Sequence, residues 1–458
     1  MAAESFIHGM VTGWYAESHT PMLSETPRRW LLCCVATLLL TASLRTAAGQ
    51  ASPTPTGQPE VLKSTNGTIT EVGVLGRAEY RIDVPASWNR SLVVFYHGYS
   101  ESPFRFRLDG SMGKQPEQMF KRGYAVIQSG YSETGWALQA GYADTETLRK
   151  YFVKKYGAPR ETFAAGGSMG GALTMITMEL NPKNTYAGGL NLCGAVGPSY
   201  VHLNRRFAIR AAFDYYFPGL MGPLDPVPAN FEESEALRQK VLTALRNKPD
   251  AAFAMREMMM LHTDVEVARA IGYFTYVIAD MQKKAGGNPF DNRGWLYTGT
   301  SVNTATDYAL NDGVRRYGPE KKAQAYLMAH YWPTGKLTRP MLALHTIYDP
   351  LIPANSLTLY ASEVAHAGYA NNLVQQYVRR EGHCTFSADE VGHAFDEMVL
   401  WVHTGKPPAA GVLSLNGSTP NGNPQGGNPS RNGVEPQASS NPPRGLVAGA
   451  SVAVKHLP

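Results

Sequence analysis

Short apolar runs without polar alternation recur through the middle of the chain. They occupy residues 92–96, 124–128, 163–166, 187–192, 341–346 and 373–378. Strands that are apolar on both faces are typical of a mainly parallel sheet. Stretches with helical periodicity alternate with these runs, at residues 145–156, 172–180 and 388–402. The alternation predicts an α/β fold with a doubly wound sheet, and residues 67–75 and 78–84 are expected to form an antiparallel hairpin at its edge.

The strand signal stops between about residues 198 and 339. The pattern there predicts helices separated by Gly/Pro turns, most clearly over 231–247 and 251–284. We therefore expect a helical insertion in a sheet protein. The consecutive residues Met258, Met259 and Met260 are interpreted as core packing, because methionine fills irregular gaps in protein interiors.

The N-terminal segment has the pattern of a secretory signal. Arg28 and Arg29 precede an apolar stretch at 30–44, which small residues follow. Residues 1–50 are therefore predicted to be a signal peptide, with Met22 as an alternative start. The apolar stretch is shorter than the roughly 20 residues that span a membrane, so we expect a secreted or periplasmic protein with no stable membrane anchor after cleavage.

The folded domain is expected between two segments of low complexity. Residues 51–60 form a Pro/Thr/Gly linker. Residues 406–458 are rich in Asn, Gly, Pro and Ser and poor in large apolar side chains, a composition typical of a disordered tail. Residues 61–405 remain as the catalytic domain, with its helical insertion at about 198–339.

Composition and charge narrow the class of protein. The 458 residues are 43% hydrophobic, enough for a sizeable core. The 42 Lys and Arg nearly balance the 37 Asp and Glu without a long basic run, so we expect no nucleic-acid partner. The 4 Cys form no C-x-x-C motif, which argues against a metal site built on thiolates. We expect no metal and no cofactor.

Ser168 lies in a G-x-S-x-G motif between an apolar strand and an apolar helix. The segment reads ETFAAGGSMGGALTMITMEL over residues 161–180. A serine hydroxyl is a weak nucleophile that needs an exposed position and a neighbouring base. A sharp strand-to-helix turn gives that exposure and tolerates only small residues around the serine, here Gly166 and Gly170. The motif in this context predicts that Ser168 is a catalytic nucleophile.

An acid and a histidine are expected to follow the serine in the sequence. Asp349 lies just beyond a predicted strand in MLALHTIYDPLIP, and His383 lies in the loop after the next one, in LVQQYVRREGHCTF. We predict Asp349 as the acid and His383 as the base. Glu381 is a less suitable acid because it is too close in sequence to orient His383 easily, and Asp291 lies in the insertion.

Aromatic and backbone groups near the strand ends complete the predicted site. The backbone N–H groups of Tyr99 and Met169 are expected to form an oxyanion hole. Tyr99, Tyr131 and Trp136 follow strand ends on the catalytic side, where they could line a substrate pocket; packing of the insertion onto the sheet explains them equally well. His97 is interpreted as a structural histidine.

These motifs resemble those of the α/β-hydrolase superfamily. The resemblance extends from about residue 61 to residue 405 and rests on His97-Gly98, the elbow around Ser168, Asp349 with Pro353, and Gly382-His383. It implies an α/β-hydrolase fold and a Ser-Asp-His triad. The elbow is similar to those of secreted esterases and prolyl-peptidase-like enzymes. His383-Cys384 is similar to the His-Cys end of tannases and fungal-type feruloyl esterases, although Gly167 stands where their partner cysteine precedes the nucleophile.

We therefore predict a secreted serine hydrolase that cleaves carboxylic esters of apolar or aromatic small molecules or polyesters. A serine peptidase on the same fold is the first alternative, which an amine-binding cluster would favour; Glu232, Glu233 and Glu235 are candidates, or simply a solvated helix face. A non-catalytic binding protein is the second alternative, and a missing triad member would favour it. No triad member is missing from the sequence.

Two structural expectations accompany this function. The insertion enters after one core strand and returns before the strand that leads to Asp349, so we expect it to form a helical lid over Ser168. Cys193 and Cys384 should be the cysteines that remain after signal removal, and both follow strands at the same edge. We predict that they form a disulfide, with two buried reduced thiols as the alternative.

Overall fold

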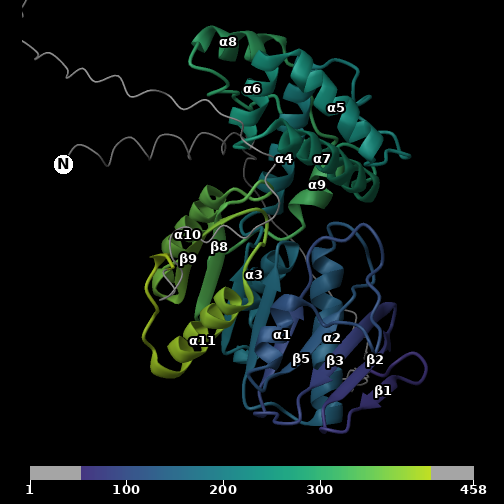
Figure 1. The fold of residues 1–458 in the computed structure, drawn as a ribbon, viewed down its shortest axis with the longest axis vertical. Coiled ribbons are helices and arrows are strands. Elements are labelled where there is room, and N and C mark those ends of the chain that lie inside the picture. The colour runs from purple at the N-terminus through teal and green to yellow at the C-terminus, as the bar shows by residue number, and fades with distance from the viewer. Residues whose placement is uncertain (1–52, 414–458) are drawn as a thin grey trace, which may run out of the picture. The chain divides into compact units, whose positions relative to one another are not determined.

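A computed structural model describes residues 53–413 of the chain, where ten strands form one sheet (Figure 1). Their order across the sheet is β1-β2-β3-β5-β4-β6-β7-β8-β9-β10. The strands are β1 (Glu60–Lys63), β2 (Ile69–Leu75), β3 (Ala78–Val84), β4 (Leu92–Tyr96), β5 (Ala125–Ser129), β6 (Thr162–Gly167), β7 (Gly188–Leu192), β8 (Met341–Tyr348), β9 (Leu373–Glu381) and β10 (Gly411–Val412).

The sheet is mainly parallel and lies between two layers of helices. From β5 onward every neighbouring pair is parallel, whereas β1, β2 and β3 pair antiparallel. Helices α2 (Leu138–Tyr156) and α3 (Met169–Leu180) pack on one face, and α1 (Lys114–Phe120) and α11 (Ala388–Thr404) on the other. The exchange of β4 and β5 in the order makes the chain wind in both directions. The predicted α/β-hydrolase fold is confirmed.

Local sequence patterns account for the elements of the sheet. The six apolar runs are all strands, and the side chains of β4, β5, β6 and β7 are buried on both faces. The predicted edge hairpin is also present, as β2 and β3 joined by a turn. The sequence patterns missed β1, β10, α1 and α10 (Leu357–His366), which are short and partly exposed elements.

The predicted helical insertion is present between β7 and β8 (Figure 1). Its helices are α4 (Ser199–Tyr216), α5 (Glu235–Asn247), α6 (Pro249–Met259), α7 (Asp264–Ala285), α8 (Thr304–Gly313) and α9 (Lys321–Met328). The helix expected over 251–284 is in fact two, because Met260 adopts a left-handed conformation that ends α6. Met259 is buried as expected for core packing, whereas Met260 is about half exposed.

The boundaries of the domain need one correction. We expected the tail to begin at 406, but residues 411–412 form β10, which pairs with β9. A two-residue strand at a sheet edge leaves almost no hydrophobic pattern, so composition alone misplaces the boundary. The predicted signal peptide and the rest of the tail lie outside the described residues. Among residues 53–413, none of the helices has the length and apolarity that crossing a membrane would require.

Candidate active site

Ser168 lies at the turn between β6 and α3. Its φ of 59° and ψ of −121° lie outside the regions that non-glycine residues ordinarily adopt. The turn also requires its glycines, since a Cβ on Gly170 would overlap the carbonyl oxygen of Tyr96 and one on Gly166 would overlap that of Gly170. The sequence G-x-S-x-G therefore forms the strained elbow that exposes a serine hydroxyl.

Asp349 follows β8 directly, and its carboxylate is buried. Its Oδ1 accepts hydrogen bonds from the backbone N–H groups of Leu351 and Ile352, both at 2.9 Å. Burial opposes the charge of this carboxylate, but its hydrogen bonds with His383 and the backbone, together with the nearby histidine charges, lower the pKa of Asp349 below its usual value. Asp349 is therefore an ionised acceptor at neutral pH.

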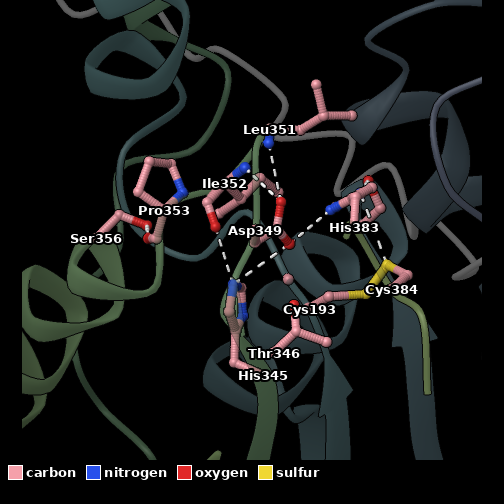
Figure 2. A network of polar contacts seen from close by, with 12 residues as sticks. Cys193, His345, Thr346, Asp349, Leu351, Ile352, Pro353, Ser356, His383 and Cys384 are labelled. Atoms are coloured by element: carbon pink, nitrogen blue, oxygen red, sulfur yellow. Dashed lines mark hydrogen bonds and ion pairs between the residues drawn. A yellow bond between two sulfur atoms is a disulfide. The ribbon is translucent and has the colours of Figure 1, made fainter. Parts of the chain in front are cut away.

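His383 joins the acid to the serine. Its Nδ1 lies 2.8 Å from Asp349 Oδ2 (Figure 2), and its Nε2 lies 2.8 Å from Ser168 Oγ. If Nδ1 donates to the carboxylate, Nε2 is left to accept the serine proton, which is the arrangement that a general base needs. Residues from three different loops thus form one continuous line of hydrogen bonds.

The other candidate acids do not take part in this line. Asp291 forms an ion pair with Arg293 at 2.6 Å in the insertion. Glu381 is the last residue of β9 and precedes the turn at Gly382, whose φ is 97°. Position in the sequence thus distinguished Asp349 from both alternatives, because Asp291 lies in the insertion and Glu381 is only two residues from His383.

Cys193 and Cys384 form the expected disulfide (Figure 2). Their Cα atoms are 5.4 Å apart. Cys193 follows β7 and is fully buried, and Cys384 directly follows His383. The bond therefore attaches the histidine loop to the strand next to the elbow.

The loop after β4 lies against the nucleophile. A Cβ on Gly98 would be 3.3 Å from the Cβ of Ser168. Tyr99 is the next residue, and Met169 is the first residue of α3, where helical N–H groups lack intrahelical acceptors. The two backbone N–H groups expected in an oxyanion hole thus belong to segments that meet at Ser168.

Ser168 and His383 open into a cleft of about 820 Å³. A cleft of this size is in the range of small-molecule sites. Its lining is largely aromatic and apolar, with polar groups from α1 and the loop before it. The apolar and aromatic members are Phe95, Tyr96, Tyr99, Phe104, Met112, Pro116, Tyr273, Leu351 and Phe386. Sequence patterns missed Tyr273 because it belongs to α7, 105 residues after Ser168.

Two of the residues predicted to line the pocket lie elsewhere. Tyr131 and Trp136 are each 4% exposed and belong to the main core. Tyr131 stacks on His97 with ring centroids 3.9 Å apart, and Trp136 donates its indole N–H to Ser199 at the start of α4. Neither is among the described residues that line the cleft. Their prediction as substrate-binding residues is wrong, since packing of the insertion onto the sheet buries Trp136.

His97 has the structural role that the sequence suggested. Its ring lies between Phe104 and Tyr131, stacked on both. Its Nδ1 is 2.7 Å from the carbonyl oxygen of Gly98. Burial lowers the pKa of His97 to about 4, so the ring is neutral at neutral pH. Packing therefore accounts for His97, and no role as a second general base is needed to explain it.

Comparison with known proteins gives a family match over part of the chain. Residues 64–194 match a tannase-like family of unknown function (DUF6351). This segment includes the elbow and Cys193, but neither Asp349 nor His383. A search of curated proteins finds no match to the chain.

Several solved structures are similar at low identity. Feruloyl esterase B from Aspergillus oryzae is 14% identical over 78% of this chain and 86% of its own, with a TM-score of 0.40. Candida antarctica lipase A is 12% identical over 79% and 86%, with a TM-score of 0.41. An esterase from Pyrococcus furiosus is 10% identical over 76% and 91%, with a TM-score of 0.37. Likeness at this level indicates nothing about the substrate.

Proposed function

We propose that this protein is a serine hydrolase that cleaves carboxylic esters of apolar or aromatic substrates. The observation that carries the proposal is the line of hydrogen bonds from Asp349 through His383 to Ser168, at 2.8 Å for both steps, in a cleft wide enough for a small molecule. The signal-like N-terminus supports action outside the cytoplasm.

The proposed reaction proceeds through an acyl-enzyme. Ser168 Oγ attacks the ester carbonyl carbon while His383 Nε2 takes the serine proton, and the resulting oxyanion accepts hydrogen bonds from the N–H groups of Tyr99 and Met169. The carbon–oxygen bond to the alcohol then breaks, and His383 returns the proton to the leaving alkoxide. Water, deprotonated by the same imidazole, attacks the acyl-enzyme and releases the acid and Ser168.

The environment of Asp349 suits its part in this reaction. Asp349 is ionised, and its carboxylate faces Nδ1 of His383. It can therefore fix the tautomer of the imidazole and stabilise the imidazolium that forms when the serine proton is transferred. Oδ1 is occupied by two backbone donors, so the carboxylate cannot rotate freely away from His383.

Apolar or aromatic substrates are proposed from the lining of the cleft. Tyr99 and Tyr273 meet edge to face, with ring centroids 5.8 Å apart and planes at 87°. Phe104 and Phe386 add further aromatic surface. Aromatic walls of this kind recognise flat or apolar groups largely by burial of surface.

The insertion is proposed to act as a lid. Helix α7 contributes Tyr273 to the cleft that contains Ser168, and Tyr276 on the same helix also meets Tyr99 edge to face. The insertion therefore contributes to the wall of the cleft through Tyr273. In this proposal the insertion selects substrates, while the sheet domain carries the chemistry.

The peptidase alternative finds less support. Among the three acidic candidates for amine binding, Glu233 and Glu235 form ion pairs with Arg238 at 3.0 and 2.9 Å. Glu232 is exposed at the start of the same segment. Acids already neutralised by an arginine offer little attraction to a substrate amine.

The test combines a covalent probe with a substrate panel. A fluorophosphonate should label the purified protein, and Ser168→Ala should abolish labelling and turnover while the circular dichroism spectrum stays the same. Short- and long-chain aryl esters, feruloyl esters and aminoacyl anilides should be assayed side by side. Full activity of the alanine variant would refute the nucleophile, and a preference for the anilides would favour the peptidase.

A further inference from the structure

His345 is a second histidine beside the acid, and the proposed reaction leaves it without a role. It lies on β8, four residues before Asp349, and its side chain is fully buried. Its Nε2 is 2.9 Å from the carbonyl oxygen of Ile352 and 3.5 Å from Asp349 Oδ2 (Figure 2). The carboxylate oxygen that faces His383 is therefore also approached by a second imidazole.

The protonation state of His345 follows from its surroundings. Burial lowers its pKa, and the neighbouring charge of His383 acts in the same direction, while Asp349 and the carbonyl of Ile352 oppose the shift. The ring is thus neutral at neutral pH. Since Nε2 faces two oxygens, it carries the proton; Nδ1 has no hydrogen-bond partner among residues 53–413. The Nε2–H group of His345 therefore contacts both the carboxylate of Asp349 and the carbonyl oxygen of Ile352 in the turn that follows.

The contacts of Ile352 show what this N–H group can hold. The backbone N–H of Ile352 donates to Asp349 Oδ1, and its carbonyl oxygen accepts from His345. The turn after β8 is therefore held through both backbone groups of Ile352. Asp349 binds its N–H group, and His345 on β8 binds its carbonyl oxygen. Without His345, this carbonyl would be left without its donor in a buried position.

We propose that His345 is a positioning residue, whose Nε2–H group holds the turn at Ile352 and aims the carboxylate of Asp349 at His383. Neutrality matters, because a cation at this place would compete with the imidazolium of His383 for the same carboxylate. A neutral donor orients the carboxylate and leaves its charge available for His383. This inference rests on the proposed serine hydrolase activity.

Glutamine and asparagine variants separate positioning from general stability. The amide nitrogen of His345→Gln can occupy the place of Nε2, whereas that of His345→Asn reaches only the place of Nδ1. His330→Gln is the matched control, because His330 is also buried and bonded to a backbone carbonyl, that of Tyr326, in a different part of the fold. That bond is made by Nδ1, whose place the glutamine amide does not reach, so this variant also loses its hydrogen bond. Each full-length variant is assayed for kcat and KM on an aryl ester and for its rate of fluorophosphonate labelling.

The expected result is a fall in kcat with KM nearly unchanged. Misplacement of a catalytic group by about 1 Å costs on the order of 100-fold, so kcat of His345→Asn should fall about 10- to 100-fold. KM should stay within about twofold, because His345 is not among the described residues that line the cleft. Labelling should slow by a similar factor as kcat, and both His345→Gln and His330→Gln should remain close to wild type.

Two results would overturn the proposal. One is equal loss of kcat in the glutamine and asparagine variants, which would mean that the position of the N–H group is irrelevant. The other is wild-type kcat in His345→Asn. If the asparagine variant does not fold, a folded His345→Gln that has lost more than about tenfold in kcat would overturn it, and one that keeps kcat would support it. A wild-type protein that neither labels nor turns over would instead refute the proposed function.

Discussion

Removal of the disulfide between Cys193 and Cys384 should inactivate the protein before it unfolds. The perturbation is the double variant Cys193→Ala/Cys384→Ala, which leaves no unpaired thiol at the site. The bond joins residues 191 positions apart in the sequence. The loop that it closes contains the insertion, Asp349 and His383, so the bond restrains most of the groups that assemble around Ser168.

Loss of the disulfide should have two effects, one on the stability of the whole domain and one on the position of the loop that carries His383. Closing a loop of this length lowers the entropy of the unfolded chain, which corresponds to about 5 kcal/mol at 25 °C as an upper value. Locally, Cys193 and Cys384 have φ angles of 46° and 57°. This left-handed conformation costs non-glycine residues about 1–2 kcal/mol each. Without the bond, the loop that carries His383 can move and so relieve the backbone strain at Cys384. A shift of about 1 Å would lower kcat by at least tenfold.

Urea unfolding and steady-state kinetics measure the two effects separately. The double variant should lose up to about 5 kcal/mol in free energy of unfolding. Its kcat should already be reduced without urea, while its circular dichroism spectrum remains that of the wild type. Dithiothreitol should reproduce the loss of kcat in the wild type and have no effect on the variant. Wild-type kcat in the double variant would refute the reasoning, as would two free thiols in the denatured, unreduced mature protein.

Three further predictions concern the acid, the buried histidine and the insertion. Asp349→Asn should lower kcat by about 10⁴ with little change in KM, because the imidazole loses its orienting acceptor; a loss below tenfold would contradict the triad. The pKa of His97 in the folded state, about 4, lies below its value of about 6.5 in an unfolded chain, so its contribution to stability is present above pH 6.5 and is lost as the pH falls toward 4. The free energy of unfolding should therefore fall less between pH 7 and pH 5 in His97→Phe than in the wild type. Equal slopes would contradict a lowered pKa of His97 in the folded state. Tyr273→Ala should change the relative kcat/KM for short- and long-chain aryl esters several-fold, while Tyr308→Ala, at a site in the insertion that is 68% exposed, should not; equal profiles for both would argue against the lid.

Features encoded over a few neighbouring residues could be predicted from the sequence. The apolar runs specified the strands of the sheet because side chains buried on both faces must all be apolar. The elbow at Ser168 was recognisable because its geometry excludes any side chain at Gly166 and Gly170. Asp349 and His383 followed from the rule that each lies just beyond a strand at the same edge of the sheet. The topology also brought Cys193 and Cys384 together for this reason.

Contacts between distant segments could not be predicted in the same way. Tyr131 and Trp136 follow strand ends, as pocket residues often do, yet both are buried in the core. The direction in which an aromatic side chain points depends on what packs over it, and for Trp136 that is the insertion. Tyr273 shows the converse, since only the packing of α7 over the sheet makes a helical tyrosine part of the cleft.

The sequence by itself thus determined the fold class and the three residues of the proposed triad. These depend on local sterics and on the order of elements along the chain, and both are readable from neighbouring residues. Only the tertiary structure decided the walls of the cleft and the second contact of Asp349 with His345. The physical reason is that burial and hydrogen bonding of a side chain depend on groups that are remote in the sequence, and for these no short pattern exists.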